Sequence, residues 1–302
     1  MPNFPNSPMQ EINTEVALPQ FLNKFDGKIH LSPPAMNIHV LMKTLADDNM
    51  GQRELAAVLH HYPVITARLI ALSNSVWACP ATPISNIETA CVRLGTAVVK
   101  GVSIAIAVAA SFNAARCPAF DPIRFWTTSM LVSEGAGLLA AKLSNKVIYC
   151  QDFQYTAQTA GILHNLGLLW LADNLATDTS EALHLAATDS LLSVNQALMQ
   201  QMGIDYCLIG AWIGKQWQIP EELIAVMRHH RDKSYQNNVS PLVLLVGAAA
   251  KMVSSMLQEN HQMPDNQHLH NLGIDEQLQS IVFNQLTNKI DSTRELAKTL
   301  FL

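Results

Sequence analysis

The sequence predicts an all-α globular protein, and three observations support this prediction. Hydrophobic residues occupy 49% of the 302 positions, which excludes a disordered chain. Apolar residues recur at helical spacing, and the alternating apolar and polar runs typical of strands are scarce. Proline and capping residues divide the chain into segments of helical length. We find no internal repeat, and the length allows one large domain or two smaller ones.

The first half of the chain contains five predicted helices. Pro63 fits the first turn of a helix, where its missing N–H costs nothing. Ser85 and Glu88 have the spacing of a capping box, and Gly95 suits the end of the short helix that follows. The predicted helices cover residues 36–45, 51–61, 63–72, 85–94 and 96–112.

A break at residues 113–121 is the predicted boundary between two subdomains. Residues 1–27 are expected to form an N-terminal extension, and residues 28–118 an N-terminal helical subdomain. Residues 119–302 are expected to form a second helical subdomain with additional C-terminal helices.

The second half shows the same signals of helix starts. Asp121-Pro122 and Ser240-Pro241 each combine a cap residue with a proline at the first helical position. Ser292 and Glu295 suggest another capping box. The predicted helices cover residues 122–144, 152–165, 190–202, 206–217, 220–230 and 241–257, followed by two at the C-terminus, and residues 259–273 are predicted to be a loop.

Charge and hydropathy argue against two classes of partner. The net charge is −5, so no basic excess is present to neutralise a phosphate backbone, and no nucleic-acid partner is expected. The N-terminus lacks the basic and apolar regions of a signal peptide. The longest apolar stretch, residues 101–112, is shorter than the about 20 residues that cross a bilayer. It predicts a buried core helix, and no membrane partner is expected.

The cysteines favour a reduced, cytoplasmic protein. Their number is odd, their spacings are wide, and none form a Cys-x-x-Cys pair. We therefore expect free and mostly buried thiols, without a disulfide framework or a zinc knuckle. The five are Cys79, Cys91, Cys117, Cys150 and Cys207.

Histidine is the main chemical resource of this sequence, because the common glycine-rich phosphate loops and nucleophile motifs are absent. Two doublets occur, His60-His61 and His229-His230. Adjacent helical residues point about 100° apart, so a doublet seldom gives two ligands to one metal. His164 differs, because it lies in the apolar segment GILHNLGLLWL. Its residue type alone is compatible with a hydrogen-bonded core histidine or with a ligand.

Six motifs then occur in a characteristic order. They are LSPPAMNIHVLMKTLADD from residue 31, PVITARLIALSNSVW from residue 63, ISNIETACVRLG from residue 84, the pair Phe125-Trp126, the segment Gly161-x-Leu163-His164-x-x-Gly167, and GAWIGKQWQIPEELIAVMRHH from residue 210. Over residues 30–232 the chain resembles the HDOD family, the HD-related output domains of bacterial signalling proteins. The resemblance implies an all-α, HD-like architecture with two packed helical subdomains.

The resemblance also implies a comparison with HD-type metal-dependent phosphohydrolases, in which histidine and aspartate ligands hold one or two metals. The matching positions here are Thr128, His164, Asn165, Tyr206, His229 and His230. Asn165 replaces the aspartate of the family's His-Asp pair. Thr128 and Tyr206 offer only hydroxyl groups, which are poor metal ligands when neutral. Two imidazoles fall short of the three or four ligands of a zinc site. No cofactor is expected, and any divalent metal would depend on His164 with His229 or His230.

Three functional hypotheses follow from the resemblance. The leading one is a non-enzymatic regulatory protein that contacts other signalling proteins, with a degenerate HD pocket. Its low content of charged residues, 14%, is also compatible with a homo-oligomer. The first alternative is a metal-dependent phosphohydrolase acting on a nucleotide or cyclic dinucleotide. The second alternative is a sensor that binds a nucleotide in the same pocket without metal.

Overall fold

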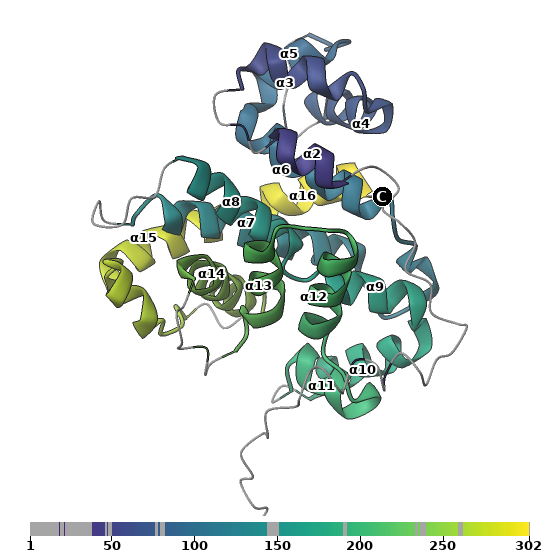
Figure 1. Cartoon of the computed structure of the whole chain (residues 1–302), viewed down its shortest axis with the longest axis vertical. Coiled ribbons are helices and arrows are strands. Elements are labelled where there is room, and N and C mark those ends of the chain that lie inside the picture. Colours follow the sequence, from purple (N-terminus) through teal and green to yellow (C-terminus); the bar gives the residue numbers. More distant parts are fainter. Residues whose placement is uncertain are drawn as a thin grey trace, which may run out of the picture.

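The structure, a computed structural model, describes residues 18, 21, 38–45, 47, 50–75, 78, 82–143, 151–189, 192–232, 235, 240–258 and 262–301. Throughout these residues the regular secondary structure is helical, with no strand. The predicted all-α class is therefore confirmed. Figure 1 shows an upper lobe of N-terminal helices above a larger lower lobe. The boundary after residue 118 stays a prediction.

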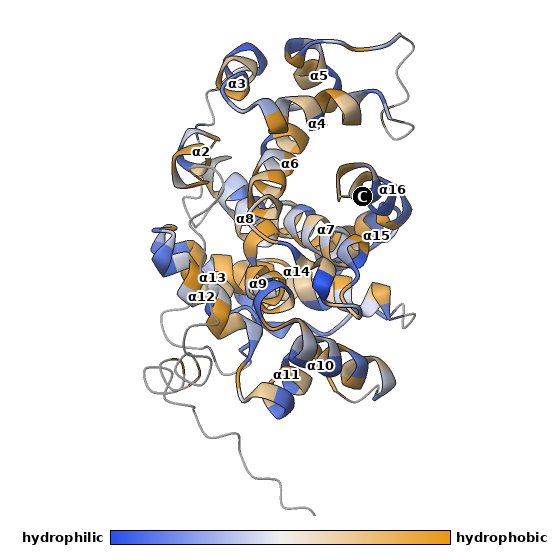
Figure 2. Cartoon of the chain, turned by 90° about the vertical axis from the view of Figure 1, so that its right-hand side faces the viewer, coloured by the Kyte–Doolittle hydropathy of each residue, from blue (hydrophilic) through white to orange (hydrophobic). Residues whose placement is uncertain are grey.

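The upper lobe forms because short amphipathic helices bury their apolar faces against one another. Ile65, Leu69 and Leu72 of α4 are fully buried, which confirms the face that the sequence predicts. The helix α6 is buried along most of its length and is largely in hydrophobic colours in Figure 2. The helices of this lobe are α2 (Ile38–Leu45), α3 (Gln52–Leu59), α4 (Pro63–Ser73), α5 (Ile87–Leu94) and α6 (Thr96–Ala109).

Asn74, directly after α4, connects the end of this helix to the segment before α5. Its side chain donates to the carbonyl oxygen of Ile84 at 2.6 Å and accepts from the backbone N–H of Ile84 at 2.7 Å. This pair of bonds fixes the chain as it approaches α5. The predicted cap of α5 is wrong by one residue: Asn86, not Ser85, accepts from the N–H of Thr89. Gly95 then separates α5 from α6 with a φ of +80°.

The lower lobe is built around α7, which contacts α8, α14, α15 and α16. Asp121 caps α7 by accepting from the N–H of Arg124, as its sequence predicts. The helices are α7 (Pro122–Ala140), α8 (Gln151–Leu163), α9 (Leu166–Asn174), α10 (Ala176–Thr188), α11 (Val194–Met202), α12 (Tyr206–Gln216), α13 (Glu221–His229), α14 (Pro241–Leu257), α15 (Glu276–Thr287) and α16 (Ile290–Phe301), with short 3-10 turns η1 (Ala114–Arg116) and η2 (Gln267–Leu272).

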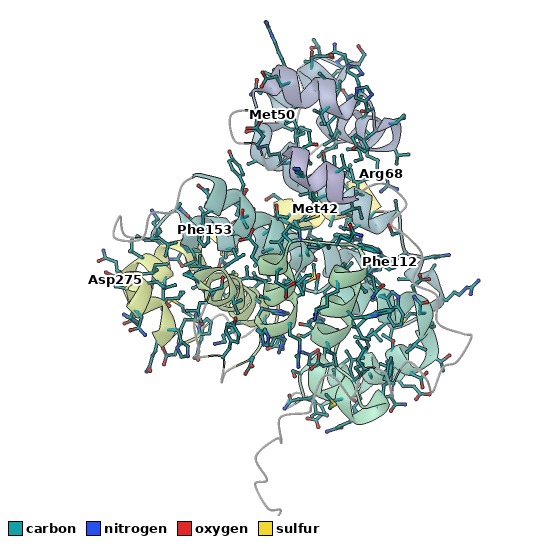
Figure 3. The ribbon with its side chains drawn as sticks, in the orientation of Figure 1. Met42, Met50, Arg68, Phe112, Phe153 and Asp275 are labelled. Atoms are coloured by element: carbon teal, nitrogen blue, oxygen red, sulfur yellow. The ribbon has the colours of Figure 1, made fainter. Side chains whose placement is uncertain are left out.

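The C-terminal helix α16 joins the two lobes. Phe301 stacks on Trp126 of α7 with a centroid distance of 4.3 Å. Arg68 of α4, labelled in Figure 3, donates to the carbonyl oxygen of Leu300. The capping box predicted at Ser292 is wrong, because Ser292 lies inside α16 and donates to the carbonyl oxygen of Lys289.

A buried lysine makes a second connection between the lobes. Lys100 of α6 is only 6% exposed. Its ammonium donates to the carbonyl oxygen of Asp47 at 2.9 Å and lies 4.5 Å from the ring centre of Tyr155 in α8. A buried ammonium needs such partners to offset its lost hydration. Lys100 therefore ties the loop after α2 to the lower lobe.

The cysteines and the apolar helices agree with the sequence where the structure describes them. Cys91, Cys117 and Cys207 are buried and free, whereas Cys79 and Cys150 lie outside the described residues. Among the described helices, none alone is long and apolar enough to cross a membrane. Together α5 and α6 would be, but they are bent by 113°.

Candidate functional site

The candidate site begins at the turn between α8 and α9. The helix predicted through Asn165 is interrupted: α8 ends at Leu163, and His164 and Asn165 form a turn before α9. Two glycines flank this turn and permit close packing. A Cβ at Gly161 would lie 2.4 Å from the Cα of Ser133, and one at Gly167 would lie 2.0 Å from the carbonyl oxygen of Tyr206. The spacing of the Gly-x-Leu-His-x-x-Gly motif thus brings α8 onto α7 and α9 onto α12.

His164 and His230 form a buried pair at the centre of the site. They are 3% and 4% exposed, and their rings meet edge to face with centroids 5.1 Å apart. Nδ1 of His164 lies 2.7 Å from the carbonyl oxygen of Gly161, and Nδ1 of His230 lies 3.0 Å from that of Val226. A carbonyl oxygen can only accept, so each Nδ1 carries the proton and each Nε2 is an acceptor.

Tyr206 is directed at the acceptor nitrogen of His230. Its hydroxyl lies 3.4 Å from Nε2 of His230, and its side chain is buried. Burial raises the pKa of Tyr206 above its usual range, although the nearby Arg231 cation opposes this shift. The phenol therefore stays neutral and donates its proton toward His230. A tyrosine in this position places a hydroxyl where a metal ion would otherwise approach that imidazole.

Asn165 is held by a serine that the sequence comparison did not identify. Oγ of Ser129 lies 3.0 Å from Oδ1 of Asn165 and also 3.0 Å from the carbonyl oxygen of Phe125. The motif comparison predicts that Thr128 faces this pocket, but its hydroxyl donates to the carbonyl oxygen of Arg124 in its own helix. The α7 side chain that reaches Asn165 is thus one residue further along than the motif suggests.

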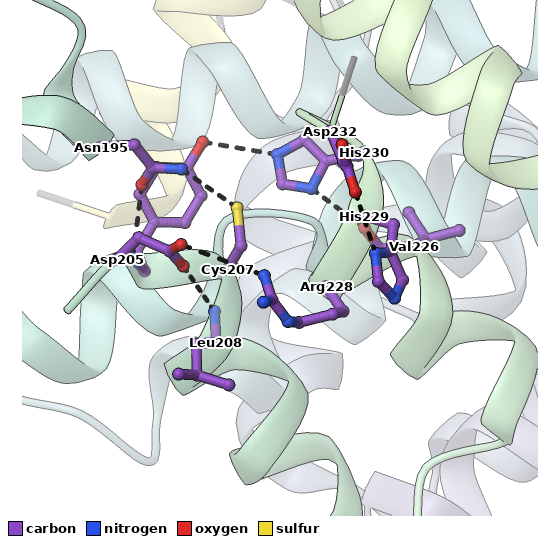
Figure 4. A network of polar contacts seen from close by, with 10 residues as sticks. Asn195, Asp205, Cys207, Leu208, Val226, Arg228, His229, His230 and Asp232 are labelled. Atoms are coloured by element: carbon purple, nitrogen blue, oxygen red, sulfur yellow. Dashed lines mark hydrogen bonds and ion pairs between the residues drawn. The ribbon is translucent and has the colours of Figure 1, made fainter. Parts of the chain in front are cut away.

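His229 lies apart from the histidine pair. Its ring stacks on Tyr235 with centroids 4.5 Å apart, and its Nδ1 lies 3.7 Å from Oδ2 of Asp232. Figure 4 shows His229 and His230 at the end of α13, with Asp232 beside His229. The structure therefore pairs His230, rather than its neighbour, with His164.

Burial keeps the pair uncharged. It lowers the pKa of His164 from 6.5 to about 4, and the Arg231 cation acts in the same direction. Burial also places the pKa of His230 well below its usual range, with His164 and Arg231 as further causes. Both rings are consequently neutral near pH 7, and the site presents two imidazole nitrogens, a phenol and a carboxamide.

The neighbouring polar groups have structural roles. Asp205 caps α12 by accepting from the N–H of Leu208 at 2.7 Å. Cys207 accepts from Nδ2 of Asn195 at 3.2 Å, and burial raises the pKa of its thiol to about 12. A thiol with such a pKa is not a nucleophile near pH 7. Figure 4 shows Asp205 and Cys207 on the α12 side of this network.

The donor set does not fit the metal centre of an HD hydrolase. Within the described part of the chain, no group of three or more His, Cys, Asp or Glu side chains could hold a metal ion. His164 and His230 supply two nitrogens, and one of these faces the hydroxyl of Tyr206. Asn165 supplies a neutral oxygen that already accepts from Ser129. A hard dication requires carboxylate oxygens, and a zinc site requires three or four ligands.

This fold and this site define an all-α, HD-like protein with a histidine pair and without the aspartate of the His-Asp motif. A family model described as "HDOD domain" matches residues 31–233, and the chain belongs to the HDOD family. A search of curated proteins finds no match.

Solved structures support the same fold. An HDOD domain protein of unknown function from Geobacter sulfurreducens aligns with a TM-score of 0.73 at 19% identity, covering 96% of this chain and all of that one. A "Putative signal transduction protein" from Marinobacter aquaeolei VT8 aligns with a TM-score of 0.78 at 18% identity, covering 96% of this chain and 66% of its own length. A "Putative phosphohydrolase" from Shewanella amazonensis SB2B aligns with a TM-score of 0.67 at 21% identity, covering 94% and 98%.

Proposed function

We propose that this chain is a non-enzymatic regulatory protein of bacterial signalling, in which the HD pocket is degenerate. The observation that carries the proposal is the hydroxyl of Tyr206 at 3.4 Å from Nε2 of His230. This contact occupies the lone pair that a metal would need. Asn165 supports the proposal, because its carboxamide adds no negative charge to attract a dication.

The same pocket has a structural role in this proposal. His164 and His230 each bond to a backbone carbonyl, and Tyr206 connects His230 to α12. A separate bond between Ser129 and Asn165 connects α7 to the turn before α9. Buried polar networks of this kind fix one arrangement of packed helices. In this proposal the pocket stabilises the packing of the helices whose outer faces contact partner proteins.

We propose that the partners are other signalling proteins, with self-association as a further outcome. The name of the Marinobacter protein, which shares this fold, supports a signalling role. The low content of charged residues, 14% of the chain, favours protein contacts because charge-poor surfaces associate readily.

A hydrolysis assay tests this proposal. The full chain would be incubated with manganese and either bis(p-nitrophenyl) phosphate or a cyclic dinucleotide, beside the folded variant His164→Gln. We expect no turnover by the wild-type protein above that of the variant. Manganese-dependent turnover that disappears in His164→Gln would contradict the proposal and establish a hydrolase.

One observation favours the alternative of a metal-dependent phosphohydrolase. Both Nδ1 atoms are anchored on backbone carbonyls, which is the arrangement that orients histidine ligands toward a metal through Nε2. The Shewanella protein with this fold is named a "Putative phosphohydrolase". Under this alternative, a metal would have to displace the hydroxyl of Tyr206 from His230.

A further inference from the structure

A pocket lies directly beside the histidine pair, and His230 itself forms part of its lining. It has a volume of about 260 Å³ and is bounded by the end of α13, by α14 and by residues 265–269 before and within η2. Both α14 and η2 follow the region that matches the HDOD family model. This pocket is therefore built largely by the part of the chain that the family comparison does not cover.

Two buried polar atoms in this pocket lack hydrogen-bond partners. Asn266 is 4% exposed; its Nδ2 donates to the carbonyl oxygen of Pro264 at 3.2 Å, whereas its Oδ1 has no partner. Nδ1 of His229 is also buried and has none, because Asp232 is 3.7 Å away. Only five such side-chain atoms occur in the described residues, and two line this one pocket. A buried acceptor without a donor costs free energy and calls for an occupant.

The lining defines the chemistry of that occupant. Oδ1 of Asn266 needs a donor, and the neighbouring carboxylate of Asp265 favours a positively charged one. Arg231, two residues after the end of α13, supplies a cation, and Val243 and Leu269 supply apolar surface. Across the whole lining, two aspartates balance one arginine and one lysine. A phosphate group would face both aspartates, whereas a ligand with one charge of each sign would find a partner for each.

We propose that this pocket binds a zwitterionic metabolite of amino-acid size, with its ammonium group on Asn266 and Asp265 and its carboxylate toward Arg231. The volume suits a single small molecule and is below the range of most drug-sized ligands. The stacked rings of His229 and Tyr235 add an aromatic surface to the lining of the pocket, and the face of a tyrosine ring attracts cations.

The pocket is mechanically connected to the histidine pair. Gly247 of α14 lines the pocket, and a Cβ at this position would lie 2.6 Å from the carbonyl oxygen of His230. Arg231 lines the pocket and also approaches the hydroxyl of Tyr206. A ligand that draws Arg231 toward its carboxylate would therefore act on the contact between Tyr206 and His230. The binding proposal itself does not depend on whether the histidine pair is catalytic.

The test is a binding screen on the full chain. The twenty common L-amino acids would each be added and the melting temperature recorded, with adenosine monophosphate as the phosphate-bearing comparison. Any amino acid that raises the melting temperature would be titrated calorimetrically. We expect at least one to bind saturably, and Asn266→Ala to weaken its binding about tenfold through loss of an acceptor for a charged donor.

Two further variants separate loss of the site from loss of the fold. Asp265→Asn alters an exposed residue without changing its size and should also weaken binding. Asn284→Ala removes an exposed asparagine on α15, which does not line the pocket, and should leave binding unchanged. Binding only of adenosine monophosphate would overturn the zwitterion assignment. Binding of none of these compounds, or unchanged amino-acid affinity in both Asn266→Ala and Asp265→Asn, would overturn the site.

Discussion

Lowering the pH should destabilise this protein through His164. The pKa of His164 falls from 6.5 to about 4 on folding, mainly because burial removes water from the charged form. The folded state therefore binds fewer protons than the unfolded state between these values. Stability contributed by neutral His164 is present above pH 6.5, declines as the pH falls through 6.5, and is fully lost below about 4.

The size of this effect follows from the two pKa values. At about pH 5 the unfolded histidine is almost fully protonated and the folded one almost fully neutral, which corresponds to a loss of about 2 kcal/mol relative to neutral pH. His230 acts in the same direction, because burial also lowers its pKa. Urea unfolding of the full chain at about pH 7.5 and about pH 5 measures the difference in the free energy of unfolding.

A variant isolates the contribution of His164 from that of the carboxylates. His164→Gln keeps a donor for the carbonyl of Gly161 but cannot titrate, so its loss of stability between the two pH values should be smaller than that of the wild type by about 2 kcal/mol. His270→Gln removes an exposed histidine and controls for the loss of a histidine elsewhere. A pH dependence in His164→Gln equal to that of the wild type would refute the reasoning.

Three further predictions concern packing, and thermal unfolding followed by circular dichroism measures each. Gly167→Ala should lower the free energy of unfolding by about 2–4 kcal/mol, because the new Cβ would lie 2.0 Å from a backbone oxygen. The control Gly210→Ala, whose Cβ would have its nearest contact at 3.4 Å, should cost far less. Equal losses in the two variants would contradict this prediction. Lys100→Met should cost about 1–3 kcal/mol by removing the bond to the Asp47 carbonyl and the contact with the ring of Tyr155 in α8, and an unchanged melting temperature would show that this connection between the lobes is not stabilising. Phe301→Ala should cost about 1–3 kcal/mol by removing its stack on α7, and no loss would mean that α16 is held by its other contacts.

The fold was predictable where helices carry strong end signals. Asp121-Pro122 gave the start of α7 because aspartate accepts from the first turn and proline fits it. Residues 166–188 form α9 and α10, although no helix is predicted there from the sequence. Their N-cap residues, Asn165 and Leu175, make no side-chain cap bond. These helices depend on burial against their neighbours, which a local reading does not reveal.

The site was predictable in its main residues but not in its register. The motifs identify His164, Asn165, Tyr206 and His230. In the structure His164 and Tyr206 contact His230, whereas the side chain of Asn165 bonds to Ser129. The motifs do not show which side chain of α7 faces Asn165, so the sequence indicates Thr128 where the structure has Ser129. The sequence also does not show which histidine of the doublet, His229 or His230, contacts His164.

The second pocket had no signal in the sequence. Asn266 lies in a polar segment that was interpreted as a loop, and its significance comes from being buried there with an acceptor unpaired. Burial of a polar residue in such a segment depends on the elements that pack against it, here α14, which contacts η2. Only the three-dimensional arrangement brings Asn266, Asp265 and Arg231 to one cavity.

The proposed function requires that the HD pocket of this chain holds no metal. Elemental mass spectrometry of untagged protein, purified without chelator and then incubated with manganese, zinc or iron and desalted, tests it most directly. We expect far less than one metal ion per chain, because Tyr206 faces His230 and Asn165 supplies no charge. A near-stoichiometric metal that disappears in His164→Gln would contradict the claim.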